Sequence, residues 1–493
     1  MKRNFILALL AFACGVISEN LAAQVSVSAD WNKTVTVSKT TPTLQVVVNP
    51  MLRTHSPMHD GTFAALKNLG ADFVRYVPWF PYPRLVVPEL EPPTKTKTFW
   101  DFTEMDSMMA DFMKAQEGHS VVINFSTIPA WMFKNDKRVD YPKNPDEVYW
   151  HYNQGTELRD TTCKELGDYF ARILEWYTKG GFKDELGVYH KSGHYYKIPY
   201  WEVLNEPDLE HETTPEQYTK RYDAIVKAMK KVSPNTKFIG ISTAFSASPE
   251  FFEYFLNPAH HKKGIPLEGI SYHFYATMAD TSQALHEYQY SFFDQAYGFM
   301  DKVRYIEGIR KRLAPKVFTC INEIGVILTG NDHKGEIPME YWNLAGAMYA
   351  YLYLEMAKVG IEVAGESQLV GYPTQFPDVS MMNWKNSKPN ARYWVLKLLK
   401  DNFGPGDKLV ETPGAPGFKA SLAVQAFNTA KGKKYLLINK RDKEANVQLP
   451  KDVVDASIQS VDGSVIEQES VPHTLSDSTV TLKPFSVSVV TLK

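Results

Sequence analysis

Two short apolar segments of the sequence each end in an asparagine followed by a glutamate. The first spans residues 200–204 and is followed by Asn205-Glu206-Pro207, where the proline removes the backbone donor that a strand would need to continue. The second spans residues 317–321 and is followed by Asn322-Glu323. Short runs rich in β-branched and aromatic residues are typical of buried strands in parallel sheets. We therefore expect two carboxyl groups, each at the end of its own strand.

Two carboxyl groups at the same end of a sheet are suited to cleaving a glycosidic bond. One protonates the departing oxygen, while the other meets the positive charge that develops at the anomeric carbon. Their pKa values must differ, because like charges placed close together do not easily both ionise. The sequence therefore predicts Glu206 and Glu323 as catalytic residues.

Eight candidate strands alternate with helical patterns over most of the chain. They span residues 44–48, 73–77, 120–125, 200–204, 237–241, 269–273, 317–321 and 362–365. This order predicts an α/β fold, a (β/α)8 TIM barrel, in which the carboxyl ends of the strands build the active site. Glu206 then follows the fourth strand and Glu323 the seventh. A doubly wound open sheet is the alternative, but the Gly-rich first turn typical of that fold is missing from the sequence.

The character of the sequence changes after Gly406. Short alternating segments separated by polar turns indicate a C-terminal antiparallel β-sandwich domain. We expect a signal peptide in residues 1–23, an N-terminal strand segment in 24–43 that joins the sandwich, the catalytic barrel in 44–405, and the sandwich in 406–493.

The N-terminus has the pattern of a secretory leader. Met1-Lys2-Arg3 precedes an apolar run over residues 5–13, and Leu21-Ala22-Ala23 offers small residues for cleavage before Gln24. The run is too short to span a membrane, and no later segment is apolar enough, so we expect an exported protein without a transmembrane segment, in the periplasm or outside the cell. Cys14 leaves a lipid anchor as the alternative.

Composition excludes several classes of protein. The 54 basic and 56 acidic side chains give a net charge of −2, which provides no field to attract nucleic acid. Charged residues make up 22% and apolar residues 44%, as in a globular chain. Cys163 and Cys320 are expected as buried thiols. Because no CxxC or HExxH pattern is present, neither a metal nor a cofactor is expected. The oligomeric state stays open.

Asn205-Glu206-Pro207 and Glu323 resemble the catalytic motifs of clan A glycoside hydrolases. In that clan the acid/base follows strand four and the nucleophile follows strand seven. Asp208 after the first motif, Phe73-Val74-Arg75 on the second strand, Ile128-Pro129-Ala130-Trp131 after the third, and the C-terminal sandwich are most similar to family 39, the β-xylosidases and α-L-iduronidase. Families 51 and 30 are also similar.

The resemblance implies a retaining double displacement on poly- or oligosaccharides. Glu323 would attack the anomeric carbon, and Glu206 would protonate the leaving oxygen and then activate water. Asn205 would bind the sugar 2-hydroxyl. His273 and Tyr275, at the end of the sixth strand, would contact the nucleophile, and core packing is the alternative for both. The family also implies exo-action of the β-xylosidase kind. An endo-acting glycanase of the same clan is the alternative.

Further residues are candidates for contact with the substrate or the nucleophile. Arg75 could hold Glu323 ionised, because an adjacent cation favours the carboxylate. Trp131 could stack on a sugar, and His55 and His59 could bind its hydroxyls. Glu366 ends the eighth strand, where many clan members carry a tryptophan, and could bind the substrate. The alternative is an ion pair for Arg75, core packing for Trp131 and a solvated loop position for His55 and His59. Glu366 could instead be a third titrating group.

Two other functions compete with a glycosidase. Gly240-Ile241-Ser242-Thr243-Ala244 nearly matches the Gly-x-Ser-x-Gly elbow of serine esterases, but the last glycine is missing and no helix follows at once. A non-catalytic carbohydrate-binding relative would keep the barrel without turnover. The presence of both glutamates argues against this second alternative.

Overall fold

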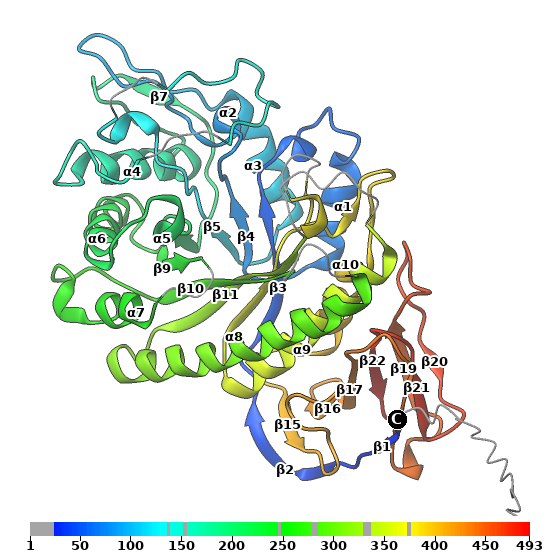
Figure 1. Ribbon diagram of the computed structural model, residues 1–493. Coiled ribbons are helices and arrows are strands. Elements are labelled where there is room, and N and C mark those ends of the chain that lie inside the picture. Colours follow the sequence, from blue (N-terminus) through cyan, green and yellow to red (C-terminus); the bar gives the residue numbers. More distant parts are fainter. Residues whose placement is uncertain are drawn as a thin grey trace, which may run out of the picture.

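The computed structural model describes residues 24–135, 139–150, 155–244, 248–278, 284–328, 337–371 and 376–493. The expected leader, with Cys14, lies outside the described residues. In Figure 1 a barrel ringed by helices stands beside a smaller unit made of β-strands.

The predicted fold class is confirmed by a closed barrel of eight parallel strands that pair in chain order. The barrel strands are β3 (Thr41–Val47), β4 (Val74–Val77), β5 (Val121–Ile123), β8 (Tyr200–Glu202), β9 (Lys237–Thr243), β10 (Gly269–Thr277), β11 (Phe318–Ile327) and β12 (Val363–Glu366). The fourth strand, β8, leads into Glu206, and the seventh, β11, carries Glu323.

Helices cover the outside of the barrel. They are α1 (His59–Leu69), α2 (Pro83–Val86), α3 (Thr103–Ala115), α4 (Lys164–Lys179), α5 (Pro207–Glu210), α6 (Pro215–Val232), α7 (Pro249–Phe255), α8 (Leu285–Leu313), α9 (Met339–Val359) and α10 (Ala391–Asn402). Local sequence sets their ends. Thr214 and Gln217 form a capping box at the start of α6, with Pro215 in its first turn. The Asn390 side chain accepts from the Arg392 N–H and caps α10.

Short elements decorate the barrel. They are the hairpin strands β6 (Gly181–Lys183) with β7 (Tyr189–Lys191) and β13 (Met382–Asn383) with β14 (Lys388–Pro389), and the 3-10 turns η1 (Pro50–Leu52), η2 (Ala130–Met132), η3 (Pro258–His260) and η4 (Pro377–Val379). A fifth turn, η5 (Lys451–Val453), lies in the β-rich unit.

Two sheets form the β-rich unit. The larger has the order β2 (Asp30–Val37), β15 (Lys408–Glu411), β16 (Leu422–Thr429), β17 (Gly432–Asn439), β22 (Val487–Thr491), β19 (Ser457–Val461) and β20 (His473–Thr474). The smaller comprises β1 (Gln24–Ser26), β18 (Ala445–Gln448) and β21 (Thr479–Leu482). Buried side chains of both sheets, among them Leu437 and Val447, form one apolar core, as in a sandwich.

The start of the chain pairs with its end. β1 runs parallel to β18, with Gln24 opposite Asn446, and β2 runs antiparallel to β15. In Figure 1 these dark blue strands lie among the orange and red ones. Segment 24–43 thus reaches both sheets of the β-rich unit before the chain enters the barrel at Thr41 in β3, earlier than the expected strand start at Leu44.

Helices α9 and α10 face the β-rich unit. Most of α9 is buried all round, because it packs on β11 and β12 of the barrel and on β2, β17 and β22 of the β-rich unit. Lys440 follows β17 and is fully buried at this junction. Its Nζ donates to the Tyr297 hydroxyl at 2.9 Å and lies 4.3 Å from the centre of the Tyr351 ring. Burial lowers the pKa of Lys440 to about 7.

Two further expectations concern cysteines and membrane spans. Cys163 and Cys320 are both free thiols and both buried. Among the described residues, no helix combines the length and the apolar character needed to cross a bilayer.

Candidate active site

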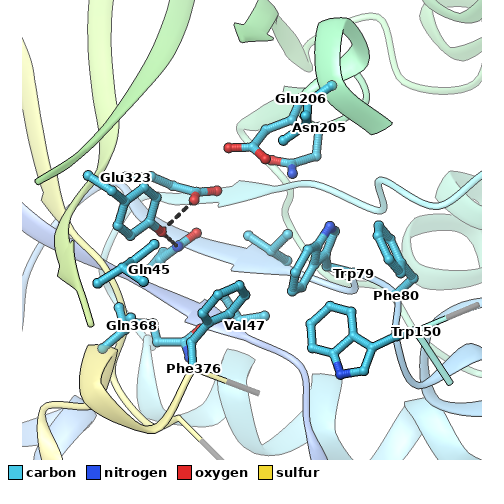
Figure 2. A pocket seen from close by; sticks show the side chains of 15 residues that line it. Gln45, Val47, Trp79, Phe80, Trp150, Asn205, Glu206, Glu323, Gln368 and Phe376 are labelled. Carbon is cyan, nitrogen blue, oxygen red and sulfur yellow. Dashed lines mark hydrogen bonds between the residues drawn. The ribbon is translucent and has the colours of Figure 1, made fainter. Parts of the chain in front are cut away.

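Glu206 and Glu323 line one cavity at the carboxyl ends of the barrel strands, with a volume of about 250 Å³. Figure 2 shows both carboxyl groups directed into the same space, with aromatic rings on the other sides. The remaining lining residues are Gln45, Val47, Val77, Trp79, Phe80, Trp150, Asn205, Leu209, Tyr275, Ile327, Gln368, Phe376 and Val379.

A strained turn delivers Asn205 and Glu206 to the cavity. Leu204 and Glu206 both adopt left-handed backbone conformations, with φ of 64° and 38°. Such conformations cost free energy for residues other than glycine and concentrate at functional sites. The turn is held because the Glu206 N–H donates to the Ser242 carbonyl at 2.8 Å and α5 begins at once with Pro207.

A bulge in β11 sets the position of Glu323. Ser271 of β10 pairs with Cys320 of β11, and His273 pairs with Glu323. Between these two pairs β10 advances by two residues and β11 by three. The extra residue bends the strand and places Glu323 beside His273. On the other side, Gly365 of β12 permits close approach to the bulge, since a Cβ there would lie 2.9 Å from the Asn322 Cα.

His273 lies between the two glutamates. Its Nδ1 is 2.8 Å from Glu206 Oε1 and 3.6 Å from Glu323 Oε1. One oxygen of each glutamate and a ring nitrogen of His273 all lie within 4.8 Å of one another. The two carboxyl groups therefore face each other across a gap of a few ångströms.

Arg75, on β4, is completely buried and bonds five side chains. Its Nε contacts Glu202 Oε2 at 2.5 Å, and one Nη1 hydrogen bond reaches Glu323 Oε1. It also donates to Gln45 Oε1 at 2.7 Å, Asn205 Oδ1 at 2.6 Å and Ser242 Oγ at 3.1 Å. The placement of Arg75 beside Glu323 agrees with the sequence-based expectation.

Tyr275 contacts the other oxygen of Glu323. Its hydroxyl donates to Glu323 Oε2 at 2.7 Å and lies 2.6 Å from Ser367 Oγ. The Tyr275 ring fits because residue 325 is a glycine. A Cβ at position 325 would lie 2.7 Å from a ring carbon of Tyr275. The two oxygens of Glu323 are thus held by a guanidinium and a phenol.

The environment separates the pKa values of the two glutamates. Burial raises the pKa of Glu206; His273 opposes this shift, and the charge of Glu323 adds to it. Burial alone would also raise the pKa of Glu323, but the charges of His273 and Arg75 and the bonds from Tyr275 and Arg75 hold it below its usual value. Burial would lower the pKa of His273, yet Glu323 and Glu206 raise it. Glu206 is therefore suited to hold a proton and Glu323 to stay ionised.

Four predicted substrate contacts lie away from the cavity. The Trp131 indole N–H donates to the Glu89 carbonyl at 2.8 Å, and Arg159 stacks over its ring. His59 lies between Asp60 and Asp111, and the exposed His55 is 3.3 Å from Asp146.

Glu366, the fourth, is buried and accepts from Arg392 Nε of α10 at 2.9 Å. Neighbouring side chains thus hold these residues outside the cavity, so the structure does not bring them to the two catalytic candidates.

Several lining residues were missed by sequence reasoning. Trp79 and Trp150 carry no local signal that separates them from the other tryptophans. Gln45 and Gln368 follow from topology alone: once the first and eighth strands are known, residues at their carboxyl ends become candidates. Glu202, two residues into the predicted fourth strand, could have been questioned as a charge in an apolar run.

Ser242 of the esterase-like motif lies within the same cluster. Its Oγ is 3.3 Å from His273 Nε2, and His273 in turn contacts Glu206. Although this order resembles a Ser-His-Glu triad, Ser242 is fully buried, accepts a hydrogen bond from Arg75 and does not line the cavity. A substrate in the cavity would meet the glutamates rather than this hydroxyl.

The spacing of Glu206, His273 and Glu323 would also admit a metal ion. However, Arg75 and Tyr275 already bond both oxygens of Glu323, and a guanidinium at this position repels a divalent cation. These donors fit a site for proton transfer better than a metal centre.

Comparison with protein families supports this interpretation. Residues 192–314 match the model of the glycosyl hydrolases family 39. This segment contains Glu206, His273 and Tyr275, and Glu323 follows shortly after its end. A comparison with curated proteins gives no match.

Solved glycosidase structures resemble the whole chain. A family 51 α-L-arabinofuranosidase from Thermotoga petrophila superposes with a TM-score of 0.62 and 16% identity, covering 95% of this chain and 100% of that one. A glucosidase from Croceicoccus marinus gives 0.60 and 15%, covering 96% and 99%. A family 30 endoxylanase from Clostridium papyrosolvens gives 0.56 and 13%, covering 95% and 100%. At these identities the likeness concerns the fold.

The barrel, the paired glutamates and the matched segment define a glycoside hydrolase of clan A. The expected enzyme class, a glycosidase, is confirmed, and its substrate is a carbohydrate. Over residues 192–314 the expected resemblance to family 39 is confirmed as well.

Proposed function

We propose that this glycosidase retains anomeric configuration through a double displacement, with Glu323 as nucleophile and Glu206 as acid/base. The main support is the separation of the two carboxyl groups, whose facing oxygens lie within 4.8 Å. Retaining enzymes place their carboxyl groups about 5–5.5 Å apart, whereas inverting enzymes need about 6.5–9.5 Å to admit a water molecule.

In the first step a Glu323 oxygen forms a bond to the anomeric carbon while the bond to the leaving oxygen breaks. The Glu206 proton passes to that oxygen. In the second step the Glu206 carboxylate takes a proton from water, the water oxygen attacks the same carbon, and Glu323 leaves as a carboxylate. Arg75 and Tyr275 stabilise this departing charge, because both donate to Glu323.

Exo-action of the β-xylosidase kind is the finer proposal. A cavity of about 250 Å³ is slightly smaller than the usual range for ligand pockets, roughly 300–1,000 Å³, and suits a chain end better than an internal segment. Early products distinguish the two modes. An exo-enzyme acting on xylo-oligosaccharides releases monosaccharide from the first turnovers, whereas an endo-acting glycanase first releases mixed oligomers.

Export is proposed from residues 1–23 alone. Expression of the full chain in a bacterial host, followed by mass determination, tests it. Removal of the leader should give a mature chain that begins at Gln24 and is found outside the cytoplasm. A lipidated chain that begins at Cys14 would favour the anchored alternative, and an uncleaved cytoplasmic chain would contradict export.

The mechanism is tested by purified protein on a panel of aryl glycosides. For the substrate that is turned over, proton NMR should show the product first in the configuration of the substrate. Glu323→Gln should abolish turnover, and Glu206→Gln should reduce it by about 10²–10⁴-fold. Glu340→Gln, an exposed change in the first turn of α9, is the matched control and should leave activity unchanged.

Azide separates the two roles. It attacks the glycosyl-enzyme without a general base, so it should restore turnover to Glu206→Ala and give a glycosyl azide of retained configuration. Inverted product, or full activity in Glu206→Gln, would contradict the double displacement. No turnover of any glycoside by the wild-type protein would instead favour a carbohydrate-binding relative.

A further inference from the structure

Glu210 is a third carboxyl group beside the cavity, for which the proposed double displacement has no role. It ends α5, one turn after Glu206, and its backbone N–H donates to the Glu206 carbonyl at 2.8 Å. One side-chain oxygen, Oε1, accepts from Asn205 Nδ2 at 2.8 Å and from Trp79 Nε1 at 2.5 Å. Asn205 and Trp79 line the cavity, whereas Glu210 stands behind them.

The second oxygen of Glu210 is buried and has no hydrogen-bond partner within the described part of the chain. No ion pair to Glu210 is found among those residues either, in contrast to Glu202, Glu323 and Glu366, which each pair with an arginine. A buried carboxyl group without a cation is more stable in its protonated form. Burial and then the charge of Glu206 raise the pKa of Glu210 well above its usual value.

These contacts set the orientation of the Asn205 carboxamide. Its Oδ1 accepts from Arg75 Nη2 at 2.6 Å, and its Nδ2 donates to Glu210. In the flipped orientation the amide NH₂ would point at the Arg75 guanidinium, which can only donate. Nδ2 carries two hydrogens. The second has no partner among the described residues, and Asn205 lines the cavity, so it remains available to an acceptor on the substrate.

The same Glu210 oxygen holds the indole of Trp79. This ring is stacked with Phe376 at 6.4 Å between centres and meets Trp150 edge-on at 5.9 Å. Together the three rings form an aromatic wall opposite the glutamates (Figure 2). Without the Glu210 carboxyl oxygen, the Trp79 N–H would lose its acceptor at the edge of this wall.

We propose that Glu210 is a positioning residue, a neutral acceptor that orients the Asn205 donor and the Trp79 ring together and so makes turnover depend on the sugar hydroxyl next to the anomeric carbon. The inference rests on the proposed function and on the contact between Asn205 and that hydroxyl which the family resemblance implies. It adds a specificity determinant that touches neither the substrate nor the reacting atoms.

The test compares an aryl glycoside with its 2-deoxy analogue in wild-type protein, Glu210→Gln and Glu210→Leu. Gln keeps an oxygen for both donors and carries no charge, so the ratio of the two kcat/KM values should stay within roughly threefold of wild type. Leu removes the acceptor. It should lower kcat/KM for the hydroxylated substrate by roughly 10–100-fold and for the deoxy substrate, which meets only the change at Trp79, by much less, so that the ratio collapses.

An equal loss on both substrates in Glu210→Leu would overturn the proposal, because a merely structural defect does not distinguish the hydroxyl. A wild-type ratio in Glu210→Leu would overturn it as well. If the wild-type protein turns over no glycoside, or Glu206→Gln stays fully active, the proposed function itself fails, so the two failures are distinguishable.

A second measurement needs no activity and serves if the Leu variant does not fold. An acid with a raised folded pKa stabilises the protein fully only below its unfolded pKa, about 4.3, and this contribution is lost as pH rises towards the folded pKa. The melting temperature of Glu210→Gln should therefore increasingly exceed that of wild type as the pH rises above about 4. The exposed Glu216→Gln is the control and should show no such trend. A difference that does not change with pH would mean that Glu210 is ionised, against the proposal.

Discussion

Replacing Arg75 by methionine should move the pH dependence of the enzyme in a defined direction. Arg75 is fully buried and bonds both Glu202 and Glu323. Methionine fills much of the same volume without a charge or a donor. Glu323 then keeps its contact with Tyr275 but loses the Arg75 cation. Glu202 becomes a buried carboxylate that has lost its arginine partner.

The size of the shift follows from the contact distance. Two unit charges about 4 Å apart interact by about 4 kcal/mol at an effective dielectric constant of about 20, which corresponds to about three pKa units. Tyr275 and His273 remain, and the site relaxes, so we expect a rise of about 1–3 units in the pKa of Glu323. Leaving two buried carboxylates short of their partner should also cost about 3–5 kcal/mol of folding stability.

The assay is the pH profile of kcat/KM on an aryl glycoside, whose acidic limb reports ionisation of the nucleophile in the free enzyme. The acidic limb of Arg75→Met should lie about 1–3 pH units above that of wild type, and the melting temperature should fall. Arg75→Lys keeps the positive charge but not the planar guanidinium with its paired donors, so its acidic limb should move less than that of Arg75→Met. An acidic limb that stays in place in Arg75→Met would show that Arg75 does not hold Glu323 ionised and would refute the electrostatic argument.

Three further changes probe other features. Gly325→Ala places a Cβ 2.7 Å from the Tyr275 ring, so kcat/KM should fall roughly tenfold or more as the bond to Glu323 is disturbed, whereas Gly298→Ala, with open space around it, should be silent. Ser242→Ala should keep glycosidase activity within about tenfold, and loss of hydrolysis of an aryl acetate would instead favour an esterase. Lys440→Met should raise the melting temperature at pH 7. The pKa of this lysine is about 7 in the folded chain and near 10.4 in the unfolded chain, so between these values protonation favours the unfolded state. This gain should shrink towards pH 10, and its absence in calorimetry would mean that burial of the charge costs little.

Much of the fold was predictable because buried parallel strands leave a clear pattern. Eight short apolar runs gave the barrel and the places of Glu206 and Glu323 in strand order. Asn205, which follows the end of β8, could be placed in the cavity by the same rule. Arg75 instead lies within β4, and its side chain bonds Glu323. His273 and Tyr275 came from the family resemblance, and the structure brings both to the glutamates.

Some expected substrate contacts lie outside the cavity, because contacts distant in sequence hold their side chains elsewhere. Arg392 in a later helix binds Glu366, and Asp111 binds His59; neither pairing leaves a local trace. Trp131 and Trp79 look alike in sequence, yet only Trp79 reaches the cavity. The acceptor role of Glu210 depends on a helix of a single turn that bends its side chain back towards Asn205.

The pairing of the first strands with the last ones has a consequence for synthesis. The strand that contains Gln24 cannot form its β-pairing until Asn446 has left the ribosome, and β2 cannot pair until β15 has been synthesised. Throughout translation of the barrel these early strands offer unpaired edges to chaperones and to other nascent chains. The sheets of the β-rich unit can therefore be completed only after the barrel has been translated. A polypeptide that ends before residue 408 would leave β2 unpaired, and quality-control factors could recognise this exposed strand edge.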